Sequence, residues 1–484
     1  MLSDDVTVLN IKHKVLQEVA KLAYDKKLEE GKELLPFQMI PGPKARFRCC
    51  IYKEREIIRQ RVRLAEGKCP SDKQSDSMIQ VISSACEECS IARYVVTDNC
   101  QKCMGKACQA ACRFGAISMG RDKSYIDPSK CKECGQCAKA CPYNAIADLV
   151  RPCMKSCPVD AISVADNGTG IAVINQDKCI QCGSCVHKCP FGAIGSKTFI
   201  VDIIKKMRSD IKVFAMLAPA TIGQFGADIT MASWRTALKK IGFYDVMDVS
   251  LGADMTAMSE AKEWIEAKEK GEKKTTSCCP AFKNYIEKHF PTLKDAISET
   301  VSPMCAVSRY IKEKFPGAVT VFIGPCVAKK SECQDKSIEG NADYVLTYGE
   351  LSSIMKARNV KFEPAENDSQ EASIYGKKFA NAGGVTAAVI QCLEETQGDA
   401  DIKVRTCNGA AECKTALTLL KLGRLPEDFI EGMVCEGGCV GGPSQHRTEK
   451  AAMKDRNALL GEADERGVHE NLEHYPMDTF SMHR

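Results

Sequence analysis

The side chains of this sequence that can do unusual chemistry are its cysteines, 29 among 484 residues, against seven histidines and two tryptophans. Two segments, residues 131–142 and 179–190, share the spacing C-x2-C-x2-C-x3-C-P. Disulfide scaffolds are short secreted chains, whereas thiols that are kept reduced in a long chain are typical metal ligands. The cysteine pattern therefore indicates bound metal rather than disulfide cross-links.

Both regular segments have the spacing of bacterial ferredoxins, in which three thiolates hold one 4Fe-4S cubane and the fourth reaches the neighbouring cluster. Zinc is the alternative, but zinc sites usually use two separated cysteine pairs rather than a run of four that ends in proline. The ferredoxin exchange predicts two cubane sites, formed by Cys131, Cys134, Cys137 and Cys189 and by Cys179, Cys182, Cys185 and Cys141.

A looser segment, residues 100–112, resembles the motif of polyferredoxin subunits, with two extra residues before its third cysteine. Its partner motif is incomplete, and a C-x2-C pair upstream completes it. By analogy, two further clusters would be held by Cys100, Cys103, Cys108 and Cys157 and by Cys86, Cys89, Cys153 and Cys112. In the alternative, some of these cysteines are free thiols and only three clusters form.

Three segments of the second half, TTSCCPAF, IGPCVAKKSE and EGMVCEGGCVGGP, resemble in order and spacing the signature motifs of the iron-iron (FeFe) hydrogenases. The resemblance spans roughly residues 76–475. It implies reversible formation of H2 from protons at an H-cluster, a 4Fe-4S cubane joined to a two-iron unit with carbon monoxide, cyanide and azadithiolate ligands. The implied cubane ligands are Cys279, Cys326, Cys435 and Cys439, of which Cys439 also bridges to the two-iron unit.

The same resemblance implies a lined pocket around the two-iron unit. Lys329 matches the charged donor to the cyanide nitrogens, where a charge-assisted hydrogen bond fixes and tunes a cofactor. Met433, soft and apolar, would pack against the two irons. The remaining wall is implied at Ala218, Pro219, Gly383, Gly384 and Val385.

A proton path is the second requirement of this chemistry. Cys278 matches the proton shuttle of the family, and Ser298 matches its relay serine. Glu260 and Glu263 are separated by three residues in a helical segment, so they share one face and suit a carboxylate relay. Taken without the neighbouring motifs, these two carboxylates would be interpreted as a solvated helix face.

The sequence predicts two kinds of domain that position these residues. We expect an α+β ferredoxin-like domain at 76–200 and an α/β catalytic domain at 201–447, with two lobes of sheet flanked by helices. Residues 1–75 are predicted to be helical and charged; their basic stretch is either a solvated or partner-facing helix or a docking site for an acidic redox partner. Residues 448–484 resemble the small subunit of some family members and are expected to pack as a belt.

Composition limits the partners. The chain has 67 basic and 63 acidic residues, a balance that argues against general nucleic-acid binding. No apolar run reaches the length of a membrane span and no secretory signal is evident, so we expect no membrane contact and a cytoplasmic protein. Without a nicotinamide or flavin fingerprint, the expected electron partner is a soluble ferredoxin or flavodoxin. The resemblance also implies hydrogenase maturation proteins as partners.

Several positions depart from the common family pattern, which points to a divergent monomeric subgroup. They are Gly324, Ala220, the Met304-Cys305 pair, and the GGPSQ and TSCCPAF variants of two motifs. Three alternatives stay open: an H2 sensor, an iron-sulfur assembly scaffold without the two-iron unit, and a pure electron-transfer protein. No role is assigned to Cys49, Cys50, Cys69, Cys305, Cys333, Cys392, Cys407 and Cys413.

Overall fold

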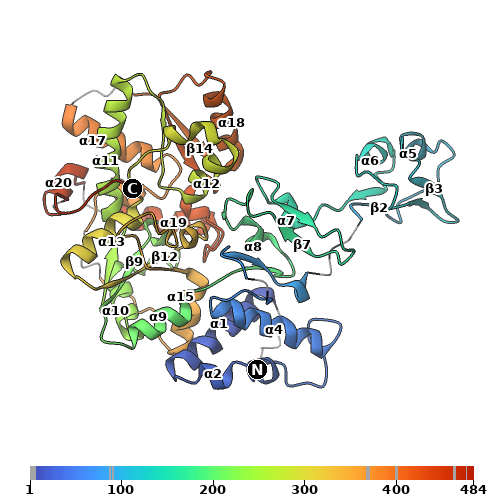
Figure 1. The fold of residues 1–484 in the computed structure, drawn as a ribbon, viewed down its shortest axis with the longest axis horizontal. Helices are drawn as coiled ribbons and strands as arrows, with labels where there is room; N and C mark the ends of the chain where they lie inside the picture. The colour runs from blue at the N-terminus through green and yellow to red at the C-terminus, as the bar shows by residue number, and fades with distance from the viewer. Residues whose placement is uncertain are drawn as a thin grey trace.

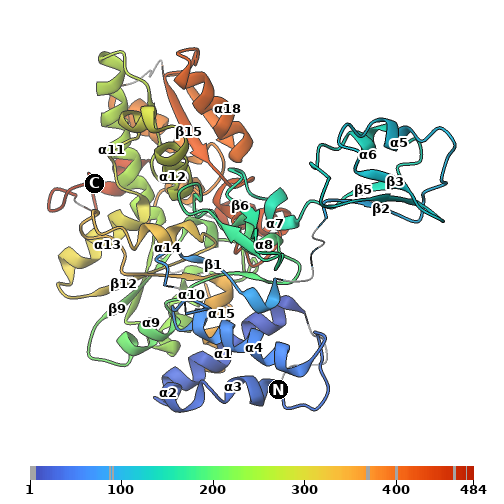
Figure 2. The same cartoon turned by 45° about the vertical axis from the view of Figure 1, so that its right-hand side comes forward.

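The computed structural model describes residues 7–72, 74–86, 89, 92–366, 371–397, 402–461, 465–475 and 477–484. A large body holds both chain ends, and a small lobe projects from it (Figure 1). The lobe still stands clear of the body after a 45° turn (Figure 2).

Two parallel sheets form the framework of the body. The first has the strand order β10-β9-β12-β13 and the second β11-β15-β14. Every residue of β9 and β15 is buried, as expected for parallel strands that are covered on both faces. The bounds are β9 Val213–Leu217, β10 Asp245–Asp248, β11 Lys274–Thr275, β12 Val319–Gly324, β13 Tyr344–Thr347, β14 Val404–Asn408 and β15 Phe429–Met433.

Helices cover these sheets, and α11 is the most enclosed of them because α13, α16 and α17 all pack against it. The helical bounds of the body are α9 Ile200–Met207, α10 Met231–Ile241, α11 Ser250–Glu269, α12 Pro280–His289, α13 Pro303–Lys314, α14 Ala328–Glu332, α15 Tyr348–Ala357, α16 Ile374–Lys378, α17 Gly384–Gln397 and α18 Ala410–Lys421. Short 3-10 turns lie at Pro219–Thr221 (η2), Pro291–Ala296 (η3) and Gly438–Gly441 (η4). The α/β architecture expected for the catalytic half is confirmed.

The N-terminal helices belong to the body and are not merely solvated. Helix α1 packs against α15 and α9, and the N-terminal helices share one apolar core with the first sheet. In α4, apolar residues such as Ile58 and Val62 recur at helical spacing and are buried, and the charged residues Glu54 and Arg61 are buried as well. The bounds are α1 Val8–Tyr24, α2 Leu28–Gly31, α3 Leu35–Met39 and α4 Ile51–Ala65.

The ferredoxin-like region divides into two lobes. The distal lobe, residues 92–150, is the projecting one and is built of β2 Tyr94–Val96, α5 Ala107–Ala110, β3 Ile117–Met119, β4 Ser124–Ile126, α6 Gln136–Ala140 and β5 Ile146–Asp148. The proximal lobe, residues 78–86 and 151–196, is built of β1 Ile79–Val81, η1 Ser83–Ala85, α7 Pro152–Lys155, β6 Ile162–Val164, β7 Ala172–Ile174, α8 Ser184–Lys188 and β8 Ile194–Ser196. Antiparallel pairs β2–β5, β3–β4, β6–β7 and β1–β8 hold the lobes together.

The C-terminal tail lies along the body. Helix α19 (Glu449–Gly461) packs against η4, and α20 (Val468–Leu472) packs against α11 and α17. Beyond them, the Val301 amide donates to the Met482 carbonyl at 2.8 Å, and the Arg484 amide donates to the Glu299 carbonyl at 3.0 Å. Among the residues that the structure describes, no helix is long and apolar enough to cross a bilayer.

Candidate functional site

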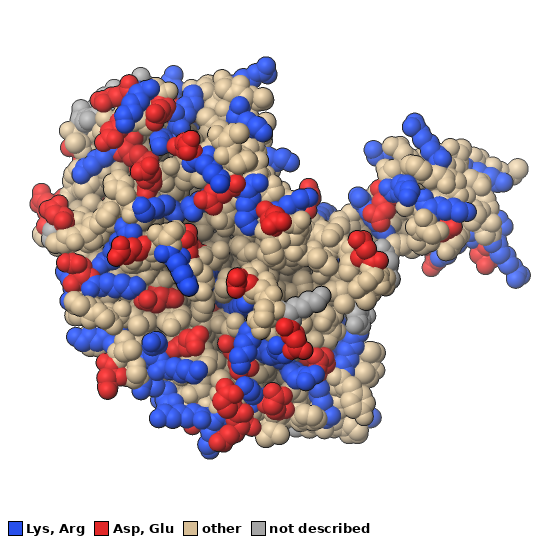
Figure 3. Space-filling model, in the orientation of Figure 1, with Lys and Arg blue, Asp and Glu red and all other residues tan. Residues whose placement is uncertain are grey.

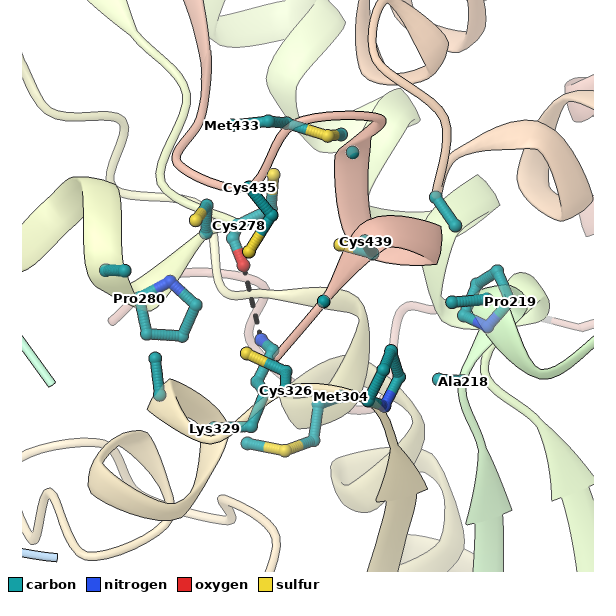
Figure 4. Close-up of a pocket in the computed structure, with 18 of the residues that line it drawn as sticks. Ala218, Pro219, Cys278, Pro280, Met304, Cys326, Lys329, Met433, Cys435 and Cys439 are labelled. Atoms are coloured by element: carbon teal, nitrogen blue, oxygen red, sulfur yellow. Dashed lines mark hydrogen bonds between the residues drawn. The ribbon is translucent and has the colours of Figure 1, made fainter. Parts of the chain in front are cut away.

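A central cavity lies at the carboxyl ends of the parallel strands, the edge at which α/β proteins usually bind ligands. Strand β9 leads into Ala218, β12 into Cys326 and β15 into Cys435. The lining is almost entirely apolar carbon and sulfur, with one charged side chain (Figure 4). The sequence-predicted residues that line it are Ala218, Pro219, Cys278, Cys279, Cys326, Lys329, Met433, Cys435 and Cys439.

The four predicted cubane ligands face this cavity from three places in the fold. Cys279 is the N-cap residue of α12 and is followed by a proline, the residue favoured at the first helical position. Cys326 lies between β12 and α14, and Cys435 and Cys439 follow β15. Gly432, also in β15, packs so closely on the Phe282 ring that a Cβ would lie 2.2 Å from it, so this approach requires glycine.

The electrostatics of three of these thiols fit a bound metal. Burial, with the charge of Cys279 second, raises the pKa of Cys326 to about 11. Burial, followed by the charges of Cys326 and Cys279, raises the pKa of Cys439 to about 12, and the same causes raise the pKa of Cys435 well above its ordinary value. Metal binding would supply the positive charge that lets these thiols deprotonate. The donor set of the cavity therefore fits an iron-sulfur group.

Lys329 is the charged side chain of the cavity. Its Nζ lies 2.6 Å from Oε2 of Glu332 and donates to the Cys278 carbonyl at 3.2 Å (Figure 4). Burial lowers the pKa of Lys329, but the Glu332 carboxylate outweighs burial and leaves it above its ordinary value. Lys329 is thus held as a cation beside the cysteines, where it can donate to an acceptor in the cavity.

The predicted wall at Gly383, Gly384 and Val385 is not among the residues that line the cavity. This segment begins α17, and its Gly383 amide donates to Oε1 of Glu431 at 2.9 Å. The preceding residue pair Phe379 and Ala380 reaches the cavity instead, and the Ala380 carbonyl accepts the Cys439 amide at 2.8 Å. The glycines therefore act indirectly, by positioning the chain that supports Cys439.

The four predicted relay residues lie between the cavity and the surface. Ser298 Oγ donates to Oε2 of Glu263 at 2.6 Å. Glu260 is fully buried, and burial, followed by the charge of Glu263, raises its pKa to about 8. Burial raises the pKa of Cys278 well above its ordinary value, with the charge of Glu260 as the second cause. At neutral pH both inner groups therefore hold a proton.

Glu260 is loosely held on both sides. Neither of its carboxyl oxygens has a partner with good hydrogen-bond geometry, although the Ser277 amide and the Ser298 hydroxyl lie near enough to oppose part of the rise in its pKa. A buried, protonated carboxyl near both Cys278 and Ser298 suits proton transfer. Glu263, at the outer end, lines a polar surface cavity together with Lys274.

Sequence reasoning missed one cation beside the cavity. Arg456, in the tail helix α19, is completely buried, and its Nη1 donates to the Pro219 carbonyl at 2.6 Å. Its Nε donates to Oδ1 of Asn381 at 3.1 Å. Burial lowers its pKa to about 10, and the charges of Tyr348, Asp248 and, last, Cys439 oppose that change. The local sequence gives no signal for it, because its partners lie 75 or more residues away.

The distal lobe brings together two sets of four cysteines, each around a small cavity. The sequence predicted that the two regular motifs exchange their fourth cysteines. The structure differs, because residues 131–141 lie in the distal lobe and residues 179–189 in the proximal lobe. The observed sets are Cys112, Cys131, Cys134 and Cys137, and Cys100, Cys103, Cys108 and Cys141.

The proximal lobe repeats this arrangement, so its predicted pairing also differs. Cys157 interacts with the regular motif, and Cys153 interacts with the C-x2-C pair upstream and with Cys189. The two sets are Cys157, Cys179, Cys182 and Cys185, and Cys86, Cys89, Cys153 and Cys189. In each lobe, the two motifs that exchange their fourth cysteines follow one another in the chain.

One local contact recurs in all four near-repeats CRFGAI, CPYNAI, CPVDAI and CPFGAI. The alanine amide donates to the Sγ of the cysteine four residues earlier, at 3.4, 3.4, 3.2 and 3.2 Å in chain order. The isoleucine that follows packs into the core of its lobe. The repeat therefore prepares each fourth cysteine as a thiolate ligand.

The proximal lobe contacts the central cavity directly. Cys182 lines the cavity, and burial raises its pKa to about 12, with Cys279 among the neighbouring charges. Lys288 of α12 donates to the Cys179 carbonyl at 2.8 Å, and Asn284 Nδ2 to the Ile180 carbonyl at 3.3 Å. One cluster site of this lobe thus adjoins the four-cysteine site of the cavity.

Comparisons with known proteins agree with this division. Residues 211–443 match the family described as iron only hydrogenase large subunit, C-terminal domain. Residues 124–147 match a 4Fe-4S binding domain, and residues 151–193 match a 4Fe-4S dicluster domain. The dicluster match covers the two adjacent motifs that the structure joins in the proximal lobe.

Among curated proteins, Iron hydrogenase 1 of Clostridium pasteurianum is 29% identical over 72% of this chain and 71% of its own length. Cytosolic Fe-S cluster assembly factor narfl of Xenopus tropicalis is 23% identical over 45% of this chain and 57% of its own length. Among solved structures, a variant of the [FeFe]-hydrogenase HydA1 from Chlamydomonas reinhardtii gives a TM-score of 0.46 at 23% identity, over 57% of this chain and 94% of that one.

The matched residues coincide with the elements described above, so the expected fold class is confirmed in both halves. The relatives include proteins named for hydrogenase activity and proteins named for cluster assembly. Residues 211–443 therefore match the C-terminal domain of the iron only hydrogenase large subunit, residues 124–147 and 151–193 match 4Fe-4S domains, and the chain is similar both to an iron hydrogenase and to a cluster assembly factor.

Proposed function

We propose that this protein is an FeFe hydrogenase of a divergent subgroup that interconverts protons and H2. The observation that supports this most is the line of protonatable groups from Cys278 through Glu260 and Ser298 to Glu263, which joins an apolar four-cysteine cavity to the surface. An electron-transfer or scaffold site needs cluster ligands only. A buried proton path is required where protons are consumed or released.

Cys279, Cys326, Cys435 and Cys439 would hold the H-cluster, and Cys439 would join its two parts. When bound, that group supplies the redox centre at which two electrons and two protons are exchanged with H2. Lys329 would donate a charge-assisted hydrogen bond to an acceptor of the bound group, and Met433 would keep water from that group. The apolar lining strengthens these electrostatic contacts by excluding solvent.

Side chains of the protein carry out the proton transfer. The Cys278 thiol passes a proton between the cavity and the Glu260 carboxyl, the Ser298 hydroxyl carries it on, and Glu263 exchanges it with the polar surface cavity. A pKa of about 8 keeps Glu260 close to the working pH, which favours transfer in both directions.

The four cysteine sets of the two lobes would hold 4Fe-4S clusters, which would carry electrons to and from the cavity. The site of Cys157, Cys179, Cys182 and Cys185 is the last step, because Cys182 borders the cavity. The distal lobe is the entry point for a soluble ferredoxin or flavodoxin. Loading of the two-iron unit requires hydrogenase maturation proteins, and we place the enzyme in the cytoplasm.

The second candidate function is iron-sulfur assembly, which the similarity to an assembly factor favours. That function explains the cluster ligands but gives no use to the buried relay or to Lys329. An H2-sensing role would keep the whole site and differ only in turnover.

The test is an infrared spectrum of anaerobically purified protein coexpressed with maturation proteins. Iron-bound carbon monoxide and cyanide absorb where polypeptide is nearly silent, so their bands are expected here. A hydrogen-evolution assay then separates an enzyme from a sensor. If the bands are missing from this protein while a known hydrogenase matured in parallel shows them, the assembly function replaces the proposal.

A further inference from the structure

Helix α4 of the N-terminal region forms one wall of a cluster site in the proximal lobe. Ile57 and Leu64 pack with Ile82, Ala85 and Ala193, and Cys86 and Cys189 lie against the same group. Residues 57, 61 and 64 follow the spacing i, i+4, i+7, so Arg61 lies on the face that covers these cysteines. An N-terminal segment for which the sequence suggested only solvent or partner contact thus borders a cluster site.

Arg61 is a buried cation on that face, only 7% exposed. Its Nη2 donates to the Gly192 carbonyl at 2.8 Å, and its Nε has no hydrogen-bond partner. Gly192 has φ +59°, and a Cβ there would lie 2.6 Å from the guanidinium, so glycine permits this close approach. The contact fixes the charge three residues from Cys189.

No carboxylate of the described residues neutralises the charge of Arg61. Among the described residues, no carboxylate forms an ion pair with Arg61, and the nearby Glu350 lies 2.5 Å from Lys330 Nζ. Lys12 lines the same small cavity as Arg61 and adds a further cation. Burial lowers the pKa of Arg61 to about 10, and the charge of Cys189 is the influence that opposes it. Buried cations are costly unless a counter-charge is near.

We infer that Arg61 is the electrostatic partner of the cluster held by Cys86, Cys89, Cys153 and Cys189, and that it raises the reduction potential of that cluster. A 4Fe-4S cluster on four thiolates is anionic, and taking up one electron adds one more negative charge. A fixed buried cation favours the reduced state, because cluster potentials depend on local charge and burial. Arg61 is a positioning residue that holds charge at the cluster.

This role makes one cluster of the path an electron store next to the cluster that borders the cavity. Among the described residues, the Sγ of each fourth-position cysteine, Cys189 included, accepts the amide of its own alanine. Arg61 donates to the Gly192 carbonyl instead, so it would act on the Cys189 site through its charge rather than through a hydrogen bond to sulfur. The inference rests on the four-cluster part of the proposed function and is independent of hydrogen chemistry at the cavity.

The test is an anaerobic redox titration of the full, cluster-loaded protein followed by electron paramagnetic resonance, with Arg61→Gln compared with wild type. One midpoint potential is expected to become more negative by about 59 mV or more, which is a tenfold change in the reduced-to-oxidised ratio of a one-electron couple. The remaining midpoints should not move. Arg59→Gln is the matched control, because Arg59 is on the same helix, more than half exposed and paired with Glu56.

Unchanged midpoints in Arg61→Gln at full iron content would overturn the inference. If that variant does not retain its iron, Arg61→Lys decides: the shorter side chain holds its charge farther from Cys189, so a smaller negative shift of one midpoint supports the inference and no shift overturns it. The readout involves no H2, so a failure of the hydrogenase proposal would leave this test unaffected.

Discussion

Four-cysteine sites occur in two opposite settings in this molecule, the distal lobe and the central cavity. In the distal lobe, Cys134 is exposed to solvent. The lobe projects from the body with lysine and arginine side chains on its surface (Figure 3). In the cavity, the cysteines are enclosed by apolar side chains and one lysine, and burial raises the pKa of Cys326 to about 11.

The difference shows that the number of ligands does not determine what a site does. An exposed cluster can exchange electrons with a carrier, whereas an enclosed cluster can reach only its neighbour and whatever enters the cavity. Cys278 and the other proposed relay residues belong to the enclosed site, so our proposal places the proton chemistry there. Variants in the distal lobe and variants in the central cavity should therefore lose different steps of the reaction.

The largest effect is expected from Cys439→Ala. Removing the residue that we propose as the bridge between the cubane and the two-iron unit should abolish H2 evolution and remove the carbon monoxide and cyanide bands from the infrared spectrum. The distal clusters should keep their paramagnetic signals. Bands that persist in this variant would show that another residue forms the bridge.

Cys278→Ala tests the proton side of the cavity alone. General acid-base groups contribute roughly 10²- to 10⁴-fold to a rate, so H2 evolution should fall by about that factor. The infrared bands and iron content should stay near those of wild type, because Cys278 is not a proposed ligand. Near-full activity in this variant would remove Cys278 from the relay.

Glu260→Gln should cause a smaller loss, roughly the 10²-fold lower end of that range. Burial and the charge of Glu263 raise the pKa of Glu260 to about 8, so wild type keeps this carboxyl protonated at pH 7 and loses the proton as the pH rises through 8. Difference infrared spectroscopy should show a carboxylic-acid band that disappears above that pH and is missing from the glutamine variant. A band that disappears near pH 4.5, the ordinary value for a glutamate, would mean that water reaches the site.

Much of the site was predictable because its residues stand in contiguous motifs. The segments around Cys279, Cys326 and Cys435 give ligand, lysine and methionine together, and parallel strands bring their carboxyl ends to one edge. The α/β framework followed from apolar strands that alternate with helices. Local order along the chain was sufficient for these features.

The parts that sequence reasoning did not reach depend on contacts between distant segments. Arg456 and Arg61 are buried by partners 75 and 131 residues away, and neither lies in a motif. The cluster pairing depends on which cysteine motifs share a lobe. The four near-repeats follow one another as two pairs, CRFGAI with CPYNAI and CPVDAI with CPFGAI, and each pair lies in one lobe. The sequence prediction missed this order because it paired the motifs by regular spacing alone.

At the other end of the molecule, Cys134→Ser should impair only the exchange with a carrier. H2 evolution driven by a reduced ferredoxin should fall several-fold, while evolution driven by a small viologen, which can reduce clusters nearer the body, should change little. The infrared bands should be those of wild type. An equal loss with both donors would mean that electrons enter the body only through this cluster.

The smallest effect is expected from the distal surface charges. Lys102 and Lys106 are exposed beside the site of Cys103, and residues 92–150 contain nine basic and five acidic residues, so an acidic carrier should be attracted there. Replacing both lysines by glutamate should lower the carrier-driven rate roughly two- to fivefold at low salt, because rim charges act mainly on association rate.

That loss should shrink as ionic strength approaches about 0.15 M, where the Debye length is about 8 Å. The matched control replaces Lys414 and Lys421, exposed on α18 of the body, by glutamate and changes the net charge equally. If the control lowers the carrier-driven rate as much as the distal variant, the whole field of the protein attracts the carrier and the distal lobe has no special part in docking. A loss confined to the distal variant would place the entry of electrons at the end of the molecule farthest from the proton path.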